Sequence, residues 1–191
     1  QLRERKYLSE AAARYGLAVA QMRAKNYAAV DREIAELRRL KASSPMLDTL
    51  ATDTKKARGD LAGALKLYRE ARTRHPRNRA LLYGQIDALL ADGQAQEALK
   101  TATAELQLSP SDPILHGLQA RSHAALGKRL QQHRAQAEMY VLQGYLAPAI
   151  QQLELAQKAG DGDYFEHSQV DARLRELRAR HLEEMKQKLP F

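Results

Sequence analysis

A spacing of 34 residues recurs along the chain and restricts the folds open to it. Three residue types keep this spacing: glycine, alanine and proline. They stand at Gly59, Gly93 and Gly127, at Ala64 and Ala98, and at Pro76 and Pro110. A period of this length is typical of repeats made of two antiparallel helices. Glycine can end a helix in the left-handed conformation, a small alanine lets helices approach, and proline stops the second helix.

The helix starts carry capping signals. Ser44 and Asp112 each precede a proline, which suits the first helical position, and Asp60 and Asn78 can cap two further helices. We predict helices at residues 2–25, 27–42, 45–58, 61–75, 79–92, 95–108, 113–126, 129–143, 146–159 and 164–188. The short connections predict antiparallel neighbours within one domain that spans residues 1–191.

Composition agrees with this interpretation, because alanine and leucine are abundant whereas valine, isoleucine and threonine are scarce. We expect an all-α solenoid of about ten antiparallel helices. It should hold about four two-helix units, an extra hairpin helix and a C-terminal capping helix. The chain opens at Gln1 in helical periodicity without a capping residue, so we expect it to be part of a longer protein.

The phase changes in the C-terminal third. Gly144 follows Gly127 by half a period, so the helix between them should serve two hairpins. Asp163 and Glu166 have the spacing of a capping box and open a long charged helix. The apolar side of this helix is predicted to hold Val170, Leu174, Leu177 and Met185. Such a helix would cover the open end of a solenoid.

One segment carries a family pattern. Gly59, Ala64, Tyr68 and Ala71 are followed by Pro76. This order of glycine, small alanine, aromatic, second alanine and terminal proline resembles the tetratricopeptide repeat (TPR). The resemblance implies a TPR-type α-solenoid whose first helices line a concave groove that binds peptides or proteins.

The repeat phase places seven side chains in that groove. The candidates are Tyr15, Met22, Asp53, Lys56, Tyr83, Asp87 and Arg121. Mixed polar and aromatic side chains suit peptide capture. The chaperone-binding members of the repeat class hold an acidic C-terminus with basic or amide residues. That mode is disfavoured, because its positions here hold Tyr15, Asp53 and Asp87.

A narrower pattern runs through the C-terminal third. It comprises residues 133–140, which end in Ala137-Glu138-Met139-Tyr140, then Gly144, and then residues 149–156 and 171–177. The pattern resembles the C-terminal repeat domain of BepA-type periplasmic zinc metalloproteases, with Val141 in place of a second aromatic residue. The resemblance implies that this chain docks on its own metalloprotease domain in the periplasm. It also implies recruitment of outer-membrane β-barrel assembly components or substrates. Zinc is then expected in the catalytic domain, which this chain does not contain.

The chain itself shows no motif for catalysis. Cysteine is absent. His116 and His123 share a helix face but are separated by about 10 Å along the axis, too far for one metal ion. No glycine-rich phosphate loop or nucleophile elbow is present. We therefore expect neither an enzymatic activity nor a cofactor in this chain, and no apolar run suggests membrane insertion.

The net charge of +8 is concentrated in the first half of the chain, most densely over residues 66–79. This stretch could attract an acidic partner or nucleic acid, or form a solvated helix face. Binding of single-stranded nucleic acid is disfavoured because aromatic residues are few, and Tyr27 and Tyr68 occupy core positions of the repeat. Two alternatives to an accessory domain of a protease therefore stay open. One is a stand-alone TPR scaffold or co-chaperone, and the other is a basic nucleic-acid-binding repeat.

Overall fold

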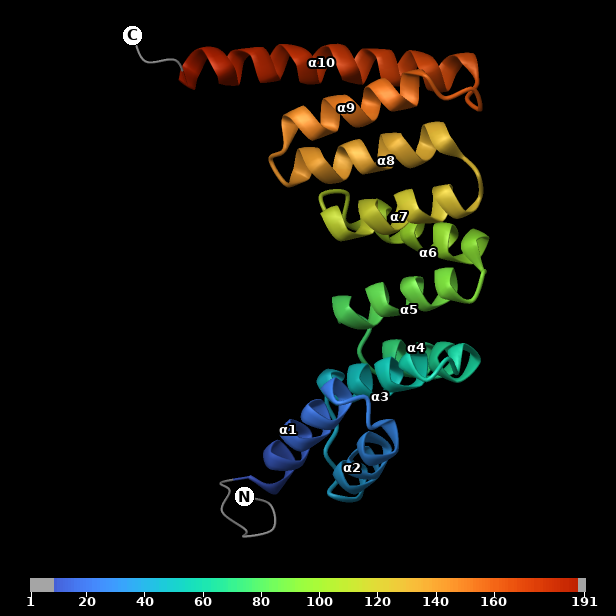
Figure 1. Cartoon of the computed structure of the whole chain (residues 1–191), viewed down its shortest axis with the longest axis vertical. Coiled ribbons are helices and arrows are strands. Elements are labelled where there is room, and N and C mark those ends of the chain that lie inside the picture. Colours follow the sequence, from blue (N-terminus) through green and yellow to red (C-terminus); the bar gives the residue numbers. More distant parts are fainter. Residues whose placement is uncertain (1–8, 189–191) are drawn as a thin grey trace. The chain divides into compact units, whose positions relative to one another are not determined.

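The computed structural model describes residues 9–188, and over this range the chain folds into ten α-helices and no strand (Figure 1). The helices are α1 (Glu10–Arg23), α2 (Tyr27–Arg39), α3 (Pro45–Ala57), α4 (Leu61–Arg74), α5 (Arg79–Ala91), α6 (Ala95–Leu108), α7 (Pro113–Ala125), α8 (Arg129–Leu142), α9 (Leu146–Gln157) and α10 (Tyr164–Lys188). The predicted all-α repeat fold is confirmed.

The helix starts agree with the prediction at every helix except α1. Side chains encode several of them. Ser44, Asp60, Asn78 and Asp112 each accept a hydrogen bond from a backbone N–H in the first turn of the following helix. These bonds satisfy donors that a helix leaves without an internal partner. Most predicted helix ends lie slightly beyond the observed ones.

The first helix differs from the prediction of residues 2–25. It begins at Glu10 because the backbone of Ser9 is extended and the Ser9 side chain accepts a hydrogen bond from the Ala12 N–H at 3.4 Å. The prediction missed this capping residue and extended the helix across it. Residues 2–8 of the predicted helix lie outside the described residues.

Residues with a positive φ follow several of the helices. The glycines with φ between 72° and 81° are Gly59, Gly93, Gly127 and Gly144. Lys25 and Lys41 take the same left-handed region, each with a φ of 56°, after α1 and α2. Lys25 precedes Gly59 by one repeat period, so the period reaches back to a lysine in the position that glycine occupies later.

The chain divides into two compact units, residues 1–92 and 93–191. The first contains α1 to α5 and the second contains α6 to α10. The prediction of one continuous domain over residues 1–191 stays a prediction.

In the first unit, α1 packs on α2, α3 on α4, and α4 on α5. The first helices of the pairs also contact one another, α1 with α3 and α3 with α5. One apolar cluster of this unit contains Ala18, Val30, Ile34, Leu37, Leu47, Leu50 and Ala51. These helices therefore place α1, α3 and α5 in a row, as the repeat phase requires for a binding face.

In the second unit, each helix from α6 to α10 packs on the next. The helix α8 contacts both α7 and α9, which confirms that the helix between Gly127 and Gly144 serves two hairpins. A continuous apolar cluster joins α8, α9 and α10, with Leu130, Ala137, Leu146, Ala149, Leu153, Ala156, Ala159, Val170, Leu174 and Leu177. The small alanines Ala64 and Ala98 are fully buried, as their predicted place between paired helices requires, and Ala149 is fully buried as well.

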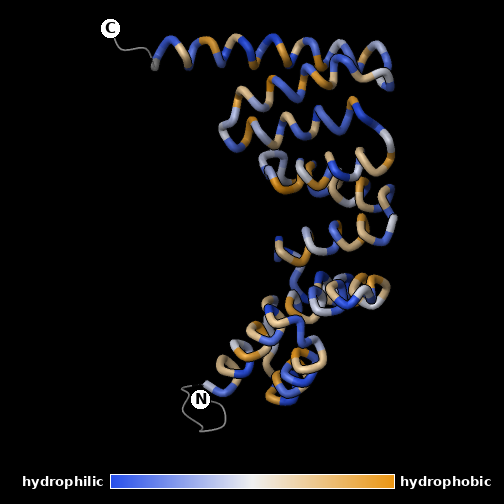
Figure 2. Tube along the Cα trace, in the orientation of Figure 1, coloured by the Kyte–Doolittle hydropathy of each residue, from blue (hydrophilic) through white to orange (hydrophobic). Residues whose placement is uncertain are grey.

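The helix α10 starts with the predicted capping box. The Asp163 N–H donates to Glu166 Oε2 at 3.1 Å, and the Glu166 N–H donates to Asp163 Oδ1 at 2.7 Å. Figure 2 shows mostly hydrophilic residues along α10, with hydrophobic ones recurring between them. Met185 does not belong to the buried side, contrary to the prediction, and is 51% exposed. The reason is length: α10 has 25 residues and α9 has 12, so the last turns of α10 pass the end of α9.

Candidate protein-binding site

Three of the predicted groove residues surround one buried tyrosine in the first unit. The Tyr68 hydroxyl donates a hydrogen bond from α4 to Asp53 Oδ1 on α3 at 2.8 Å. Lys56 lies one turn further along α3, with its Nζ 3.7 Å from the same oxygen. Asp87 on α5 is close enough for its charge to act on the hydroxyl. We call Asp53, Lys56, Tyr68 and Asp87 the Tyr68 cluster.

The electrostatics of this cluster follow from burial. Tyr68 is fully buried, and desolvation raises the pKa of its hydroxyl above the ordinary range. The negative charges of Asp53 and Asp87 raise the pKa further, while a hydrogen bond with Thr52 opposes them. The hydroxyl therefore stays protonated and acts as a donor that orients the Asp53 carboxylate.

A glycine makes room for this tyrosine. A Cβ built on Gly84 of α5 would stand 2.5 Å from the Tyr68 hydroxyl oxygen and 2.8 Å from Cζ. The ring cannot move aside because Tyr68 is fully buried. The close approach of α4 and α5 thus depends on Gly84, and it brings Asp87 of the same helix toward the cluster.

Asp53 and Lys56 are partly exposed members of the cluster. Their side chains are 40% and 31% exposed. The Asp53 carboxylate can accept hydrogen bonds from the backbone N–H groups of a peptide. The Lys56 ammonium group can donate to the peptide's carbonyl oxygens. Their orientation is set before a partner arrives, which reduces the entropic cost of binding.

Tyr15 and Met22 contribute to packing, and their place in the groove stays a prediction. Both lie on α1 and pack, partly buried, against the apolar cluster of the first unit. The Thr54 hydroxyl of α3 also lies 3.7 Å from the Met22 sulfur. These two side chains therefore contribute to the α1–α3 packing, and only their exposed portions are available to a partner.

The other groove candidates are on α5 and α7. Tyr83 lies one turn before Asp87 on α5, and both are partly buried. Arg121 lies on α7 in the second unit and is exposed. The structure thus brings Asp53, Lys56 and Asp87 together, and places Tyr83 on the same helix as Asp87. The sequence analysis did not identify the Tyr68 hydroxyl as part of the site. The aromatic position of the repeat predicts a packed ring and gives no information about the hydrogen bond of its hydroxyl.

The basic stretch over residues 66–79 covers most of α4 and the turn after it. Part of its charge is engaged within the first unit. Arg72 donates to Gln85 Oε1 at 2.9 Å, and Arg74 lies 3.0 Å from Asp48. Lys66, Arg69 and Arg77 are exposed. The stretch is therefore divided between structural contacts and a solvated face.

The histidines are spread over several helices. His116 Nε2 lies 2.9 Å from the Pro110 carbonyl oxygen, and His133 Nδ1 lies 2.8 Å from Gln152 Oε1. His123 lines a cavity of about 430 Å³ in the second unit, and burial lowers its pKa. Among residues 9–188, no three histidine, cysteine, aspartate or glutamate side chains gather as a metal site would require. The same residues include no helix long and apolar enough to cross a membrane.

The chain is similar to one sequence family and to several solved structures. The sequence model of the tetratricopeptide repeat family matches residues 56–122. MamA from Desulfovibrio magneticus RS-1 is 15% identical, with 91% of this chain and 98% of that chain covered and a TM-score of 0.62. A thermophilic TPR protein from Thermus thermophilus is 18% identical, with 87% and 98% covered and a TM-score of 0.54. A tetratricopeptide repeat protein from Parabacteroides merdae ATCC 43184 is 12% identical, with 93% and 78% covered and a TM-score of 0.55.

A search of curated proteins gave no match. The structural likenesses have low sequence identity and concern the fold. Repeats of this type suggest a protein–protein interaction module, and the fold is typical of proteins without catalytic activity. The matched segment, residues 56–122, and the structural neighbours together support a tetratricopeptide-repeat domain in this chain.

Proposed function

We propose that this chain is the protein-interaction module of a periplasmic zinc metalloprotease. In this proposal it docks on the catalytic domain of the protease and recruits outer-membrane β-barrel assembly components or substrates. The catalytic domain, and not this chain, holds the zinc. The support for the protease is the resemblance of residues 133–177 to the C-terminal domain of BepA-type proteases.

The observation that carries the binding function is the Tyr68 cluster. It joins α3, α4 and α5 through a buried hydroxyl and presents Asp53 and Lys56 at a partly exposed surface. The contact between α3 and α5 supports this surface as the binding face, because first helices line the face that helical repeats use for ligands. Tyr83 adds an aromatic side chain on α5, and tyrosine is enriched among interface residues that dominate affinity.

The experiment is capture of a separately expressed BepA-type catalytic domain by the immobilised chain. Tyr83→Ala and Lys56→Ala should each weaken capture by about 1 to 3 kcal/mol, the range of interface hot spots. Arg121→Ala tests whether the second unit takes part. Tyr164→Ala is the matched control, because this tyrosine is 89% exposed on α10, far from α3 and α5 in sequence.

Two outcomes would overturn the proposal. Failure of the wild-type chain to retain the catalytic domain would remove the protease link and leave a stand-alone TPR scaffold. Tight, salt-sensitive retention of RNA that is lost with Arg72→Ala, Arg74→Ala and Arg77→Ala combined would instead favour the nucleic-acid function. Periplasmic location is tested on the full-length protein by cell fractionation, where recovery in the cytosol would contradict it.

A further inference from the structure

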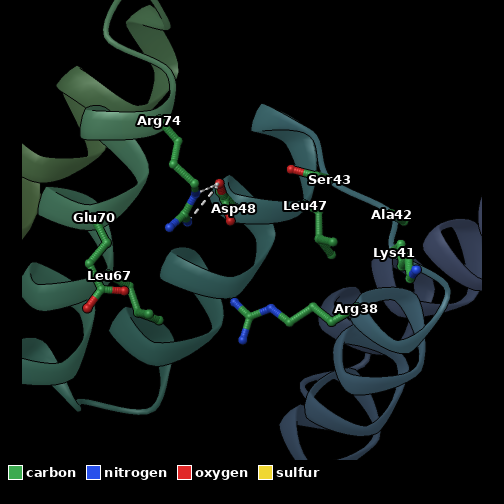
Figure 3. Close-up of a pocket in the computed structure, with 9 residues that line it drawn as sticks. All are labelled: Arg38, Lys41, Ala42, Ser43, Leu47, Asp48, Leu67, Glu70 and Arg74. Carbon is green, nitrogen blue, oxygen red and sulfur yellow. Dashed lines mark hydrogen bonds and ion pairs between the residues drawn. The ribbon is translucent and has the colours of Figure 1, made fainter.

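A second candidate site lies away from the Tyr68 cluster, in the first unit between α2, α3 and α4. It is a cavity of about 410 Å³, within the size range of ligand pockets. Figure 3 shows the nine residues that line it. They are Arg38, Lys41, Ala42, Ser43, Leu47, Asp48, Leu67, Glu70 and Arg74. We call this cavity the α2–α4 pocket.

The pocket combines apolar and charged lining residues. Leu47 is buried, and Ala42 and Leu67 pack against the apolar cluster of the first unit. Arg38 and Lys41 are exposed at the end of α2 and just after it. In Figure 3, the guanidinium group of Arg38 extends from α2 toward the space in front of Leu67. A ligand here would meet aliphatic carbon and cationic groups together.

The acidic residues of the pocket do not cancel these two cations. Asp48 is held by Arg74, with Nη2 at 3.0 Å, and lies 3.4 Å from His75 Nε2. Glu70 is exposed on α4 and forms no ion pair with Arg38 or Lys41. The side chains of Arg38 and Lys41 form no hydrogen bond or ion pair with any other residue in the range 9–188. Lys66 and Arg69 add exposed positive charge on α4 beside Leu67 and Glu70.

Lys41 follows α2 in the same left-handed turn that Lys25 and Gly59 form after α1 and α3. Its φ of 56° is a conformation that glycine adopts freely and a lysine does not. The helix end accounts for this backbone, because the Lys41 N–H donates to the Arg38 carbonyl oxygen and the Ala42 N–H donates to the Leu37 carbonyl oxygen. Lys25 has the same φ of 56° at the end of α1 but does not line the pocket. Lys25 and Lys41 thus share a backbone conformation and a charge but differ in position, so comparing them isolates the effect of a charge at the pocket.

We propose that the α2–α4 pocket binds an acidic peptide segment. One carboxylate of the peptide is held by the fork of Arg38 and a second by Lys41, and an aliphatic side chain between them contacts Leu47 and Leu67. Charge complementarity and the apolar residues select this ligand. The pocket lining has no aromatic side chain on which a nucleic-acid base could stack. The inference rests on the protein-binding function and adds a second surface to it.

The test is a fluorescence titration of the whole chain with two labelled pentapeptides. One has a central leucine flanked on each side by two acidic residues, and the other has asparagine and glutamine in place of the acids. The acidic peptide should bind at least about tenfold more tightly, since charged hydrogen bonds discriminate strongly in such sites. The titration contains no protease, so failure of the catalytic-domain capture would not affect it.

Two glycine variants form a matched pair. Lys41→Gly should weaken binding of the acidic peptide about two- to fivefold, as expected for one exposed ion pair, while the melting temperature does not fall. Lys25→Gly removes the same charge at the same backbone conformation and should leave the affinity within about twofold because only screened long-range attraction is lost. Arg38→Gln should weaken binding about five- to tenfold, because the fork is lost.

Equal affinity for the two peptides would overturn the proposal. So would equal losses from Lys25→Gly and Lys41→Gly, because the effect would then be one of net charge. A single-stranded RNA that binds more tightly than the acidic peptide, and loses its affinity with Arg38→Gln, would assign the pocket to nucleic acid instead.

Discussion

The two units solve the same structural problem with different residues. In the second unit, α7 and α8 are followed by Gly127 and Gly144, which take a positive φ without steric cost. In the first unit, α3 is likewise followed by Gly59, but α1 and α2 are followed by Lys25 and Lys41 in the same conformation. A residue with a Cβ is disfavoured there by about 1 kcal/mol. The repeat fold therefore requires the left-handed turn but not the glycine, and the first unit uses that freedom to place charge.

The interiors of the units differ as well. The second unit has a continuous apolar cluster that α10 closes with Val170, Leu174 and Leu177. The first unit contains the buried hydroxyl of Tyr68 and its carboxylate partner. We expect the second unit to respond most to lost apolar contacts and the first to respond most to changes near its polar groups.

The largest expected effect tests the closing helix. Leu174→Ala should lower the free energy of unfolding by about 2 to 5 kcal/mol, the usual range for a buried leucine. Leu174 is 2% exposed, whereas Leu182 on the same helix is 56% exposed. Leu182→Ala is the control and should have little effect. Chemical denaturation of both variants checks this, and equal losses would show that α10 is held along its whole length.

The next effect tests the close packing around Tyr68. Gly84→Ala should destabilise the protein by about 1 to 3 kcal/mol, because the new methyl group meets a buried ring. Gly16 in α1 is the matched control, since a Cβ there would have no atom within 4 Å. Gly16→Ala should stabilise the protein by about 0.5 to 1 kcal/mol through helix propensity. Thermal melting of the two variants should give shifts of opposite sign, and shifts of the same sign would contradict the packing of α4 against α5.

The comparison of helix ends leads to a smaller effect. Gly127→Ala should cost about 1 kcal/mol, because alanine is strained at positive φ. Lys25→Gly should gain about 0.5 kcal/mol, the relief of strain being partly offset by the greater freedom of glycine in the unfolded chain. Urea unfolding measures both. A loss of stability in Lys25→Gly would mean that the lysine side chain contributes more than its backbone costs.

The smallest effect concerns pH and the second unit. Burial, with a contribution from Lys128, lowers the pKa of His123 below 6.5, while Glu166 opposes the shift. As pH falls through 6.5, the unfolded chain binds a proton more readily than the folded one, so folding loses stability below that pH. Well above pH 6.5 this histidine is neutral in both states and contributes nothing to the pH dependence. His123→Gln should remove part of the loss between about pH 7.5 and 5.5 in urea titrations, and an unchanged pH dependence would contradict it.

Local signals made much of the fold predictable. A capping side chain such as Asp60 or Asn78 lies at the first turn it stabilises, so it marks a helix start in sequence. Helix ends are harder to place, because their last carbonyls can be satisfied in several ways over neighbouring residues. This explains why the prediction located the start of α2 correctly but placed its end at residue 42 and not at Arg39.

The candidate site was predictable only in part. The repeat phase indicated Asp53 and Asp87 as members of one face, and both lie near Tyr68. The phase could not show that Tyr15 and Met22 pack into an apolar cluster, because side-chain burial depends on the neighbouring helix. It also gave no sign of the α2–α4 pocket, whose lining comes from three helices and the turn after α2.

The sequence alone therefore determined the all-α repeat, the helix starts from α2 to α10 and the absence of cysteine, because these depend on residues close together in the chain. Only the tertiary structure decided which charges are neutralised and which are left for a partner. Arg74 and Arg38 look alike in sequence, yet Arg74 is paired with Asp48 while Arg38 faces the α2–α4 pocket. The physical reason is that ion pairing acts over a few ångströms in space, and residues separated by a whole helix in sequence reach that distance only when the helices pack.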